Sequence, residues 1–153
     1  MNQSFIKLIR TPYEEPYHLN LVLQASNGGC MGTFEFYVDS KSLLEISSGI
    51  KAAPITEFKW QIGSKDPQDR FAYYLSIRCY SVRSGGECAL EIIIDNNQSG
   101  PERESSEFSI LALPADLDRL SELLTNFSKL KHEVLEWSLV DGRIYNSEDK
   151  KEC

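Results

Sequence analysis

The sequence predicts an α+β domain in which an antiparallel β-sheet of about seven or eight strands, built from hairpins, carries two packed amphipathic helices. Residues 18–50 and 73–130 follow the same order of strand, turn, apolar strand and helix. Apolar residues alternate with polar ones in the expected strands and recur every three or four residues in the expected helices. Asn, Gly and Pro residues separate these segments, as is typical of turns.

A strand at residues 4–10 precedes the first hairpin. Asn27-Gly28 predicts a type I′ turn, because both central residues of that turn need a positive φ. The resulting register sets Leu21 opposite Phe34 and places the apolar residues of both strands on one face.

The helix after this hairpin is expected to begin at Asp39 or Ser40, since either side chain can accept a hydrogen bond from the first turn. Gly49 predicts its end. Residues 57–63 alternate aromatic or aliphatic residues with polar ones, which predicts a half-buried strand.

A second hairpin joins residues 71–82 to residues 87–96. One register places its apolar pairs on one face and sets Arg78 directly opposite Glu91 on the other, a favourable pair of charges. A polar loop then leads to a strand at residues 107–113.

Pro114 suits the first position of the second helix, which runs to about residue 130, and a last strand covers residues 134–139. We expect one α+β domain over residues 1–140 and a polar, frayed tail at residues 141–153. An internal pseudo-repeat would align, at one constant offset, Phe34, Phe36, Leu43, Ile46 and Ile50 with Phe108, Ile110, Leu117, Leu120 and Leu124.

Composition narrows the classes of function. The 153 residues are 41% hydrophobic and carry a net charge of -7, with scattered Lys and Arg, which argues against nucleic-acid binding. No apolar run is long enough for a membrane span, and the N-terminus lacks the pattern of a secretory signal, so we expect a cytoplasmic protein. The four cysteines show no CxxC spacing, which favours free thiols over a metal site.

No motif indicates catalysis or a cofactor: GxSxG, HExxH, Walker-type and GxGxxG patterns are absent from the sequence. The predicted register sets His18 opposite Tyr37 and diagonal to Glu35, so that His18 and Glu35 could form a proton-transfer pair. A solvated surface histidine is the simpler interpretation of His18.

The candidate binding residues lie on the hairpin faces that point away from the predicted core. Tyr and Arg side chains anchor many protein interfaces, and acidic neighbours would select a basic partner. The alternative is that the tyrosines merely stabilise strands. These candidates are His18, Glu35, Tyr37, Tyr74, Arg78, Tyr80, Glu91 and Asp95.

A resemblance is carried by strand, turn and core positions within residues 17–139, including the segments HLNL at residues 18–21, ASNG at 25–28, FEFYV at 34–38, AYYL at 72–75 and ALEIIIDNN at 89–97. In these segments the chain resembles a group of small bacterial proteins that includes the immunity protein of the wall-associated contact toxin. The resemblance implies a bacterial cytosolic protein that neutralises a toxin domain by binding it. It transfers no site residue, because none of these positions marks a known contact.

Three hypotheses follow. The first is a non-enzymatic protein-binding module whose acidic face takes a basic toxin domain. The second is a small-molecule-binding protein or enzyme with a pocket between sheet and helices, which would require a deep cavity with convergent polar groups. The third is a subunit of a homo-oligomer assembled through a sheet face or edge.

Overall fold

A computed structural model describes residues 3–15, 17–83 and 86–147. Within these ranges the chain forms two α-helices, nine β-strands and two short 3₁₀ turns. The strands and helices are β1 Ser4–Glu14, β2 His18–Asn27, β3 Met31–Val38, α1 Ser40–Ala52, β4 Phe58–Gly63, β5 Tyr74–Ser81, β6 Cys88–Asp95, β7 Ser105–Ala112, α2 Pro114–Phe127, β8 Val134–Ser138 and β9 Gly142–Tyr145, and the 3₁₀ turns are η1 Pro67–Asp69 and η2 Gly100–Glu102.

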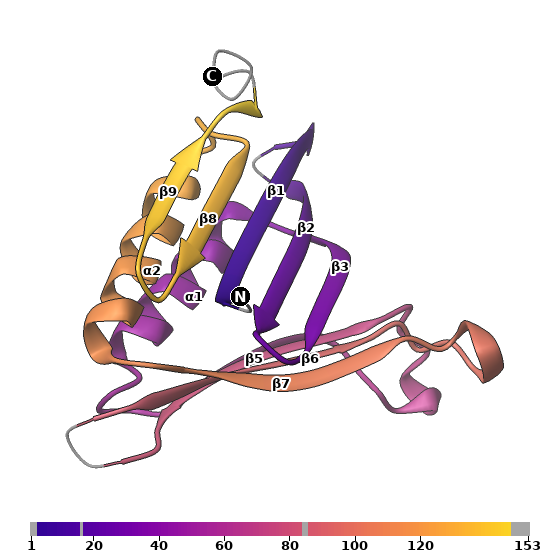
Figure 1. Cartoon of the computed structure of the whole chain (residues 1–153). Coiled ribbons are helices and arrows are strands. Elements are labelled where there is room, and N and C mark those ends of the chain that lie inside the picture. The colour runs from indigo at the N-terminus through magenta and orange to yellow at the C-terminus, as the bar shows by residue number, and fades with distance from the viewer. Residues whose placement is uncertain (1–2, 16, 84–85, 148–153) are drawn as a thin grey trace.

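The strands form two antiparallel sheets. Sheet A has five strands in the order β3-β2-β1-β8-β9, and sheet B has four in the order β4-β5-β6-β7. Sheet A stands upright above sheet B, and the two helices lie beside sheet A (Figure 1). The predicted α+β class with two helices is confirmed, whereas the prediction of one sheet is wrong. Strands β1–β3 and β5–β7 do not pair with each other, so they belong to separate sheets. β4 pairs with β5 of sheet B, and β8 pairs with β1 of sheet A.

The two halves of the chain therefore follow one plan: a three-stranded meander, a helix, and a strand that joins the sheet of the other half. The helices contact each other at equivalent residues. Ser47 Oγ donates to the carbonyl of Ser121 at 2.7 Å, and Ser121 Oγ donates to the carbonyl of Ser47 at 2.9 Å, across a separation of 74 residues. Such reciprocal bonds are what a pseudo-twofold axis between α1 and α2 would produce.

The predicted register of the second hairpin is confirmed, with Arg78 opposite Glu91 and Cys79 opposite Leu90. The predicted turn of the first hairpin is wrong by one residue. Asn27 donates its N–H to the carbonyl of Cys30 at 3.1 Å, so the turn consists of the two glycines between them. Of these two, Gly28 has a positive φ, of 93°, which fits a type II′ turn rather than type I′.

The side chain of Asn27 explains this position of the turn. Its Oδ1 accepts the N–H groups of Gly29 and Cys30 at 2.9 and 2.8 Å. As a consequence Leu21 lies opposite Phe36 rather than Phe34. Because the register changes by two residues, every apolar side chain stays on the expected face of the sheet.

Both helix starts are as predicted, but α1 continues past Gly49. Asp39 caps α1 by accepting the N–H of Ser42 at 2.8 Å, and Pro114 is the first residue of α2. Gly49 instead provides room for a ring, because a Cβ atom on it would lie 2.1 Å from the side chain of Phe58.

The predicted frayed tail is wrong for residues 142–145, which form β9 and pair with β8. Glu136 of β8 holds this strand through hydrogen bonds from Arg143 and Tyr145. Residues 148–153 of the predicted tail lie outside the described residues.

The hydrophobic core fills the space in which the inner faces of both sheets meet the helices. Its large, fully buried side chains include Trp137, Phe127, Leu21, Leu90 and Leu117. The indole of Trp137 donates to the carbonyl of Asp116 at 2.9 Å, so this buried N–H is satisfied. Neither helix of the described chain is long and apolar enough to cross a membrane.

Candidate functional site

The eight predicted binding residues divide between two surfaces. His18 belongs to β2, and Glu35 and Tyr37 belong to β3, so these three lie in sheet A. The other five lie in β5 and β6 of sheet B, namely Tyr74, Arg78, Tyr80, Glu91 and Asp95. The single surface implied by a one-sheet fold is therefore not formed.

In sheet A the predicted placement of His18 is wrong. The shifted register sets Asn20 opposite Tyr37, while His18 pairs with Glu14 of β1. The carboxylate of Glu35 accepts a hydrogen bond from Asn20 Nδ2 at 3.1 Å. This strand register gives no geometric support to a proton-transfer pair of His18 and Glu35.

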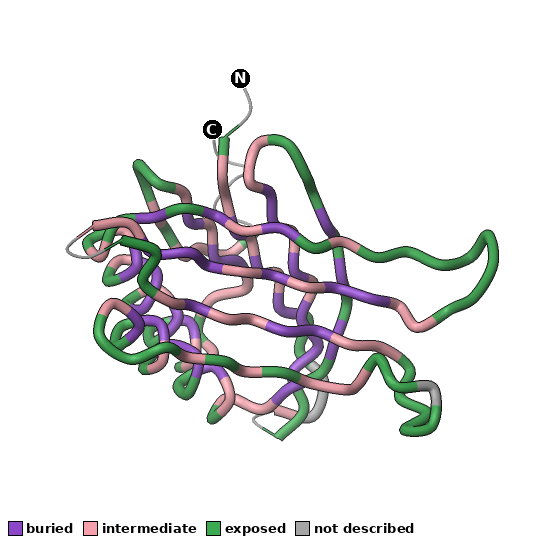
Figure 2. Tube along the Cα trace, turned by 90° about the horizontal axis from the view of Figure 1, so that it is seen from below, coloured by how far each residue is buried: buried purple, intermediate pink, exposed green. Residues whose placement is uncertain are grey.

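Figure 2 views the molecule from the side of sheet B. In this sheet Arg78 lies between Lys59 of β4 and Glu91 of β6. Its guanidinium donates two hydrogen bonds to Glu57, both 3.2 Å long, and its Nη1 lies 3.7 Å from Glu91 Oε2. The same group stacks on Tyr80, at 4.1 Å from the ring centroid. Hydrogen bonding from Arg78 holds the pKa of the Glu57 carboxyl below its usual value. Arg78 thus contacts Glu57, Glu91 and Tyr80 at the same time.

Tyr74 extends this surface along β5. Its hydroxyl donates to Gln61 Oε1 at 3.3 Å, and Lys65 Nζ lies 5.7 Å from its ring centroid. Between Tyr74 and Arg78 lies Ser76, which is 1% exposed and whose hydroxyl finds no partner in the described part of the chain. The accessible part of the outer face of sheet B therefore combines aromatic rings and charges, with the Ser76 hydroxyl buried between them.

Asp95 does not belong to the accessible part of this surface, contrary to the prediction. It is 1% exposed, because the following loop folds over it. Arg103 Nη2 lies 2.6 Å from Asp95 Oδ2, and the N–H of Asn97 donates to Oδ1 at 2.8 Å. Asp95 thus stabilises the loop between β6 and β7.

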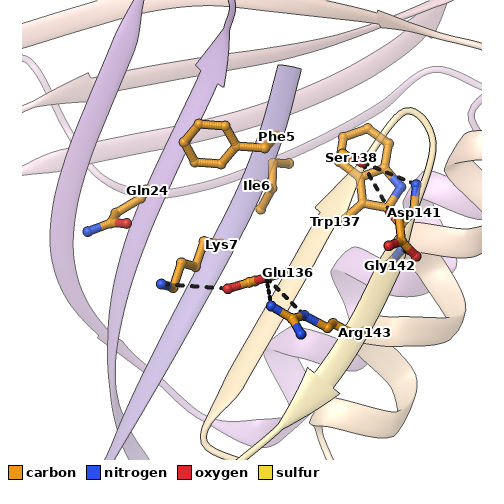
Figure 3. A pocket seen from close by; sticks show the side chains of 10 residues that line it. All are labelled: Phe5, Ile6, Lys7, Gln24, Glu136, Trp137, Ser138, Asp141, Gly142 and Arg143. Atoms are coloured by element: carbon orange, nitrogen blue, oxygen red, sulfur yellow. Dashed lines mark hydrogen bonds and ion pairs between the residues drawn. The ribbon is translucent and has the colours of Figure 1, made fainter. Parts of the chain in front are cut away.

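A hollow of about 470 Å³ on the outer face of sheet A, lined by both apolar and charged side chains, was not predicted. Figure 3 shows Glu136 between Lys7 and Arg143, and the carboxylate lies 3.7 Å and 3.0 Å from their nitrogens. Tyr145 also donates to Glu136, at 2.5 Å. The sequence signal for this cluster was the alternation of Arg143 and Tyr145 around Ile144. The opposite charges are already paired with one another, so the cluster fastens β9 to the sheet.

Other chemistry has little geometric support. Among the described residues no group of three His, Cys, Asp or Glu side chains could hold a metal ion. Cys79 and Cys88 are free, buried thiols, and burial raises the pKa of Cys79 to about 12. The void between sheets and helices has a volume of about 40 Å³ and is lined by aliphatic and aromatic side chains alone.

Comparison of the chain with protein-family models, with curated proteins and with solved structures gives no match.

Proposed function

We propose that this chain is a non-enzymatic protein-binding module of the bacterial cytosol and that it binds its partner through the outer face of sheet B. The observation that carries this proposal is the arrangement of Arg78, held between Glu57 and Glu91 and stacked on Tyr80. Arg and Tyr are the residue types that most often dominate binding energy at interfaces. Because their side chains are already ordered, binding would lose less conformational entropy.

Charge supports a basic partner. The surface of the whole chain is acidic, with a net charge of -7. Such a surface attracts basic proteins and speeds their association. A basic toxin domain neutralised by binding, as the resemblance to immunity proteins suggests, fits this chemistry. The accessible charged residues on and beside the face are Glu57, Glu91 and Glu107 with Lys59, Lys65 and Arg78, so the acidic character lies in the chain as a whole.

The alternative of a small-molecule pocket between sheet and helices has weaker support. Ligand pockets usually have volumes of roughly 300–1,000 Å³ and contain a few convergent polar groups. The core void is about 40 Å³ and wholly apolar. A homo-oligomer joined through sheet B would bring together two chains that each carry -7.

The test is quantitative affinity capture from a lysate of the cells that make the protein, with three baits: wild type, Tyr80→Ala and Tyr145→Ala. Tyr145 is a matched control, because its ring also stacks on an arginine, Arg143, at 4.6 Å, but on sheet A. We expect a basic protein that binds wild type and Tyr145→Ala and is lost with Tyr80→Ala. The captured protein, once purified, should bind Tyr80→Ala at least about tenfold more weakly, as expected for an interface anchor.

Two results would count against the proposal. Equal capture by Tyr80→Ala and wild type would show that the outer face of sheet B is not the binding surface. The absence of any saturable basic protein would contradict the proposed class of partner.

A further inference from the structure

The free edge of β3 is open to pairing with another strand. The bond from the Asn27 N–H to the Cys30 carbonyl sets the alternation of the ladder, so the even-numbered residues of β3 exchange backbone hydrogen bonds with β2. The odd-numbered residues direct their backbone groups away from β2, as the bond from the Tyr37 N–H to Tyr73 Oη at 3.4 Å shows. Thr33 and Glu35 alternate with Tyr37, so their backbone N–H groups point the same way, toward the edge at which β3 has no neighbouring strand. An edge of this kind is a template for an added strand.

The other sheet edges are less available. The carbonyl of Ser109, at the middle of the β7 edge, accepts a hydrogen bond from Asn27 Nδ2 at 3.3 Å. β9 has four residues, and β4 has six and packs Phe58 against α1 at Gly49. β3 has eight residues and no proline, so it offers the longer uninterrupted edge.

A groove lies beside this edge. Sheet B continues past β3 and forms a floor beneath its free side (Figure 1). The hollow at this corner has a volume of about 560 Å³, and β3 residues 31–34 form one wall while the ends of β6 and β7 form the other. The ring of Phe34 meets Tyr73 edge-on at 5.0 Å and supports that wall.

Exposed apolar side chains line β3 and the neighbouring loop. Met31 is 58% exposed and Tyr37 is 47% exposed, and they stand near opposite ends of β3. Phe71, 54% exposed, precedes Tyr73 in the loop before β5. Alternating apolar contacts along an edge strand give specificity to an added strand, whose backbone supplies the hydrogen bonds.

We infer that the β3 edge accepts an extended, basic segment of a partner protein as an added strand of sheet A. Glu35 and Glu104 contribute negative charge at the edge and in the groove, whereas the charge of Arg103 is neutralised by Asp95. A second copy of this chain would bring its own net charge of -7 to the same edge, so charge favours a basic occupant over self-pairing. The inference does not depend on binding at the outer face of sheet B.

The experiment measures residue-resolved amide hydrogen exchange by NMR, with a capped peptide of alternating lysine and valine as the probe, about as long as β3. In the free protein we expect fast exchange at Thr33 and Glu35 and slow exchange at Phe34 and Phe36, which are bonded to β2. Saturating peptide should slow exchange at Thr33 and Glu35 at least about tenfold. Phe34 and Phe36 should remain slow.

Two control peptides separate strand addition from simple charge attraction. A peptide N-methylated at alternate residues cannot complete the ladder, and a peptide with glutamate in place of lysine has the wrong charge. Both should leave Thr33 and Glu35 unprotected. Binding of the lysine peptide should be unchanged in Tyr80→Ala, so failure at the β3 edge and failure at sheet B give different results.

Unchanged exchange at Thr33 and Glu35 in millimolar lysine peptide would overturn the inference. Equal protection by the glutamate peptide would overturn the inference that the occupant is basic. Protection that grows with protein concentration in the absence of peptide would indicate self-pairing and would overturn it as well.

Discussion

Arg10 provides a quantitative test of how the end of α2 is attached to sheet A. Its side chain is 6% exposed and makes three hydrogen bonds: to Glu15 at 2.5 Å and to the carbonyls of His132 and Leu130 at 3.1 and 3.2 Å. The two bonds to carbonyls join β1 to the loop between α2 and β8. Replacing Arg10 with Met keeps most of the apolar stem but removes all three donors.

The expected loss follows from these contacts. Hydrogen bonds to charged groups each contribute about 1.5–3 kcal/mol, and breaking a buried ion pair by removing one partner costs about 3–5 kcal/mol. Because such contributions do not add fully, we expect Arg10→Met to lower the free energy of unfolding by about 3–5 kcal/mol. For a chain of this size, that loss corresponds to a fall in Tm of roughly 6–20 °C.

Urea and thermal unfolding followed by circular dichroism would measure the change, with Lys7→Met as the matched control. Lys7 lies on the same strand but on the outer face, and its Nζ is 3.7 Å from Glu136 with both side chains partly exposed. Such a pair contributes about 0–1 kcal/mol. If Arg10→Met unfolds within about 1 kcal/mol of wild type, the bonds of Arg10 do not hold the loop and the reasoning is refuted.

Three further predictions concern single positions. Gly49→Ala should destabilise the protein by about 1–3 kcal/mol in urea unfolding, although alanine favours helices, because the added Cβ would meet the ring of Phe58. The loss should be smaller when Phe58 is replaced with leucine, and an equal loss in that variant would contradict the clash. Hydrogen bonds from Ser42 lower the pKa of Asp39. The contribution of the Asp39 carboxylate to the free energy of unfolding should therefore be complete above about pH 4, the usual aspartate range, and fade as pH falls through the lower pKa of the folded state. In urea unfolding Asp39→Ala should lose about 1 kcal/mol at pH 7 and less in acid, and a loss independent of pH would argue against the charged cap. Burial raises the pKa of Cys79 to about 12. After alkylation of the native protein at pH 8, mass spectrometry should find exposed Cys30 modified and Cys79 unmodified until denaturant is added. Rapid modification of Cys79 would show that β5 opens.

The sequence predicted those features whose signals are local. The β5–β6 register followed from two independent constraints, the apolar pairs on one face and Arg78 opposite Glu91 on the other, and both are satisfied. The turn after β2 was misplaced because Asn27-Gly28 is a strong turn signal in itself, whereas the side chain of Asn27 caps a turn that starts one residue later.

The division into two sheets could not be predicted in this way, because the pairing of β1 with β8 joins opposite ends of the chain and leaves no local pattern. Only part of the candidate site was predicted, because contacts between separate segments leave no local pattern. Arg78, Tyr80 and Glu91 lie in one hairpin and were brought together as expected, but Asp95 is buried by Arg103 from the loop that follows it.

The exchange of strands between the two halves has a consequence for how the chain folds. Phe5 pairs with Ser138, so sheet A cannot be completed until nearly the whole chain has been synthesised. Neither half contains all the strands of its own sheet, and each would leave an open edge if it were produced alone. High contact order of this kind slows folding, because the entropy of closing a long loop is lost before the last strand is in place. Two fragments divided between β4 and β5 would therefore be expected to assemble with each other rather than to fold separately.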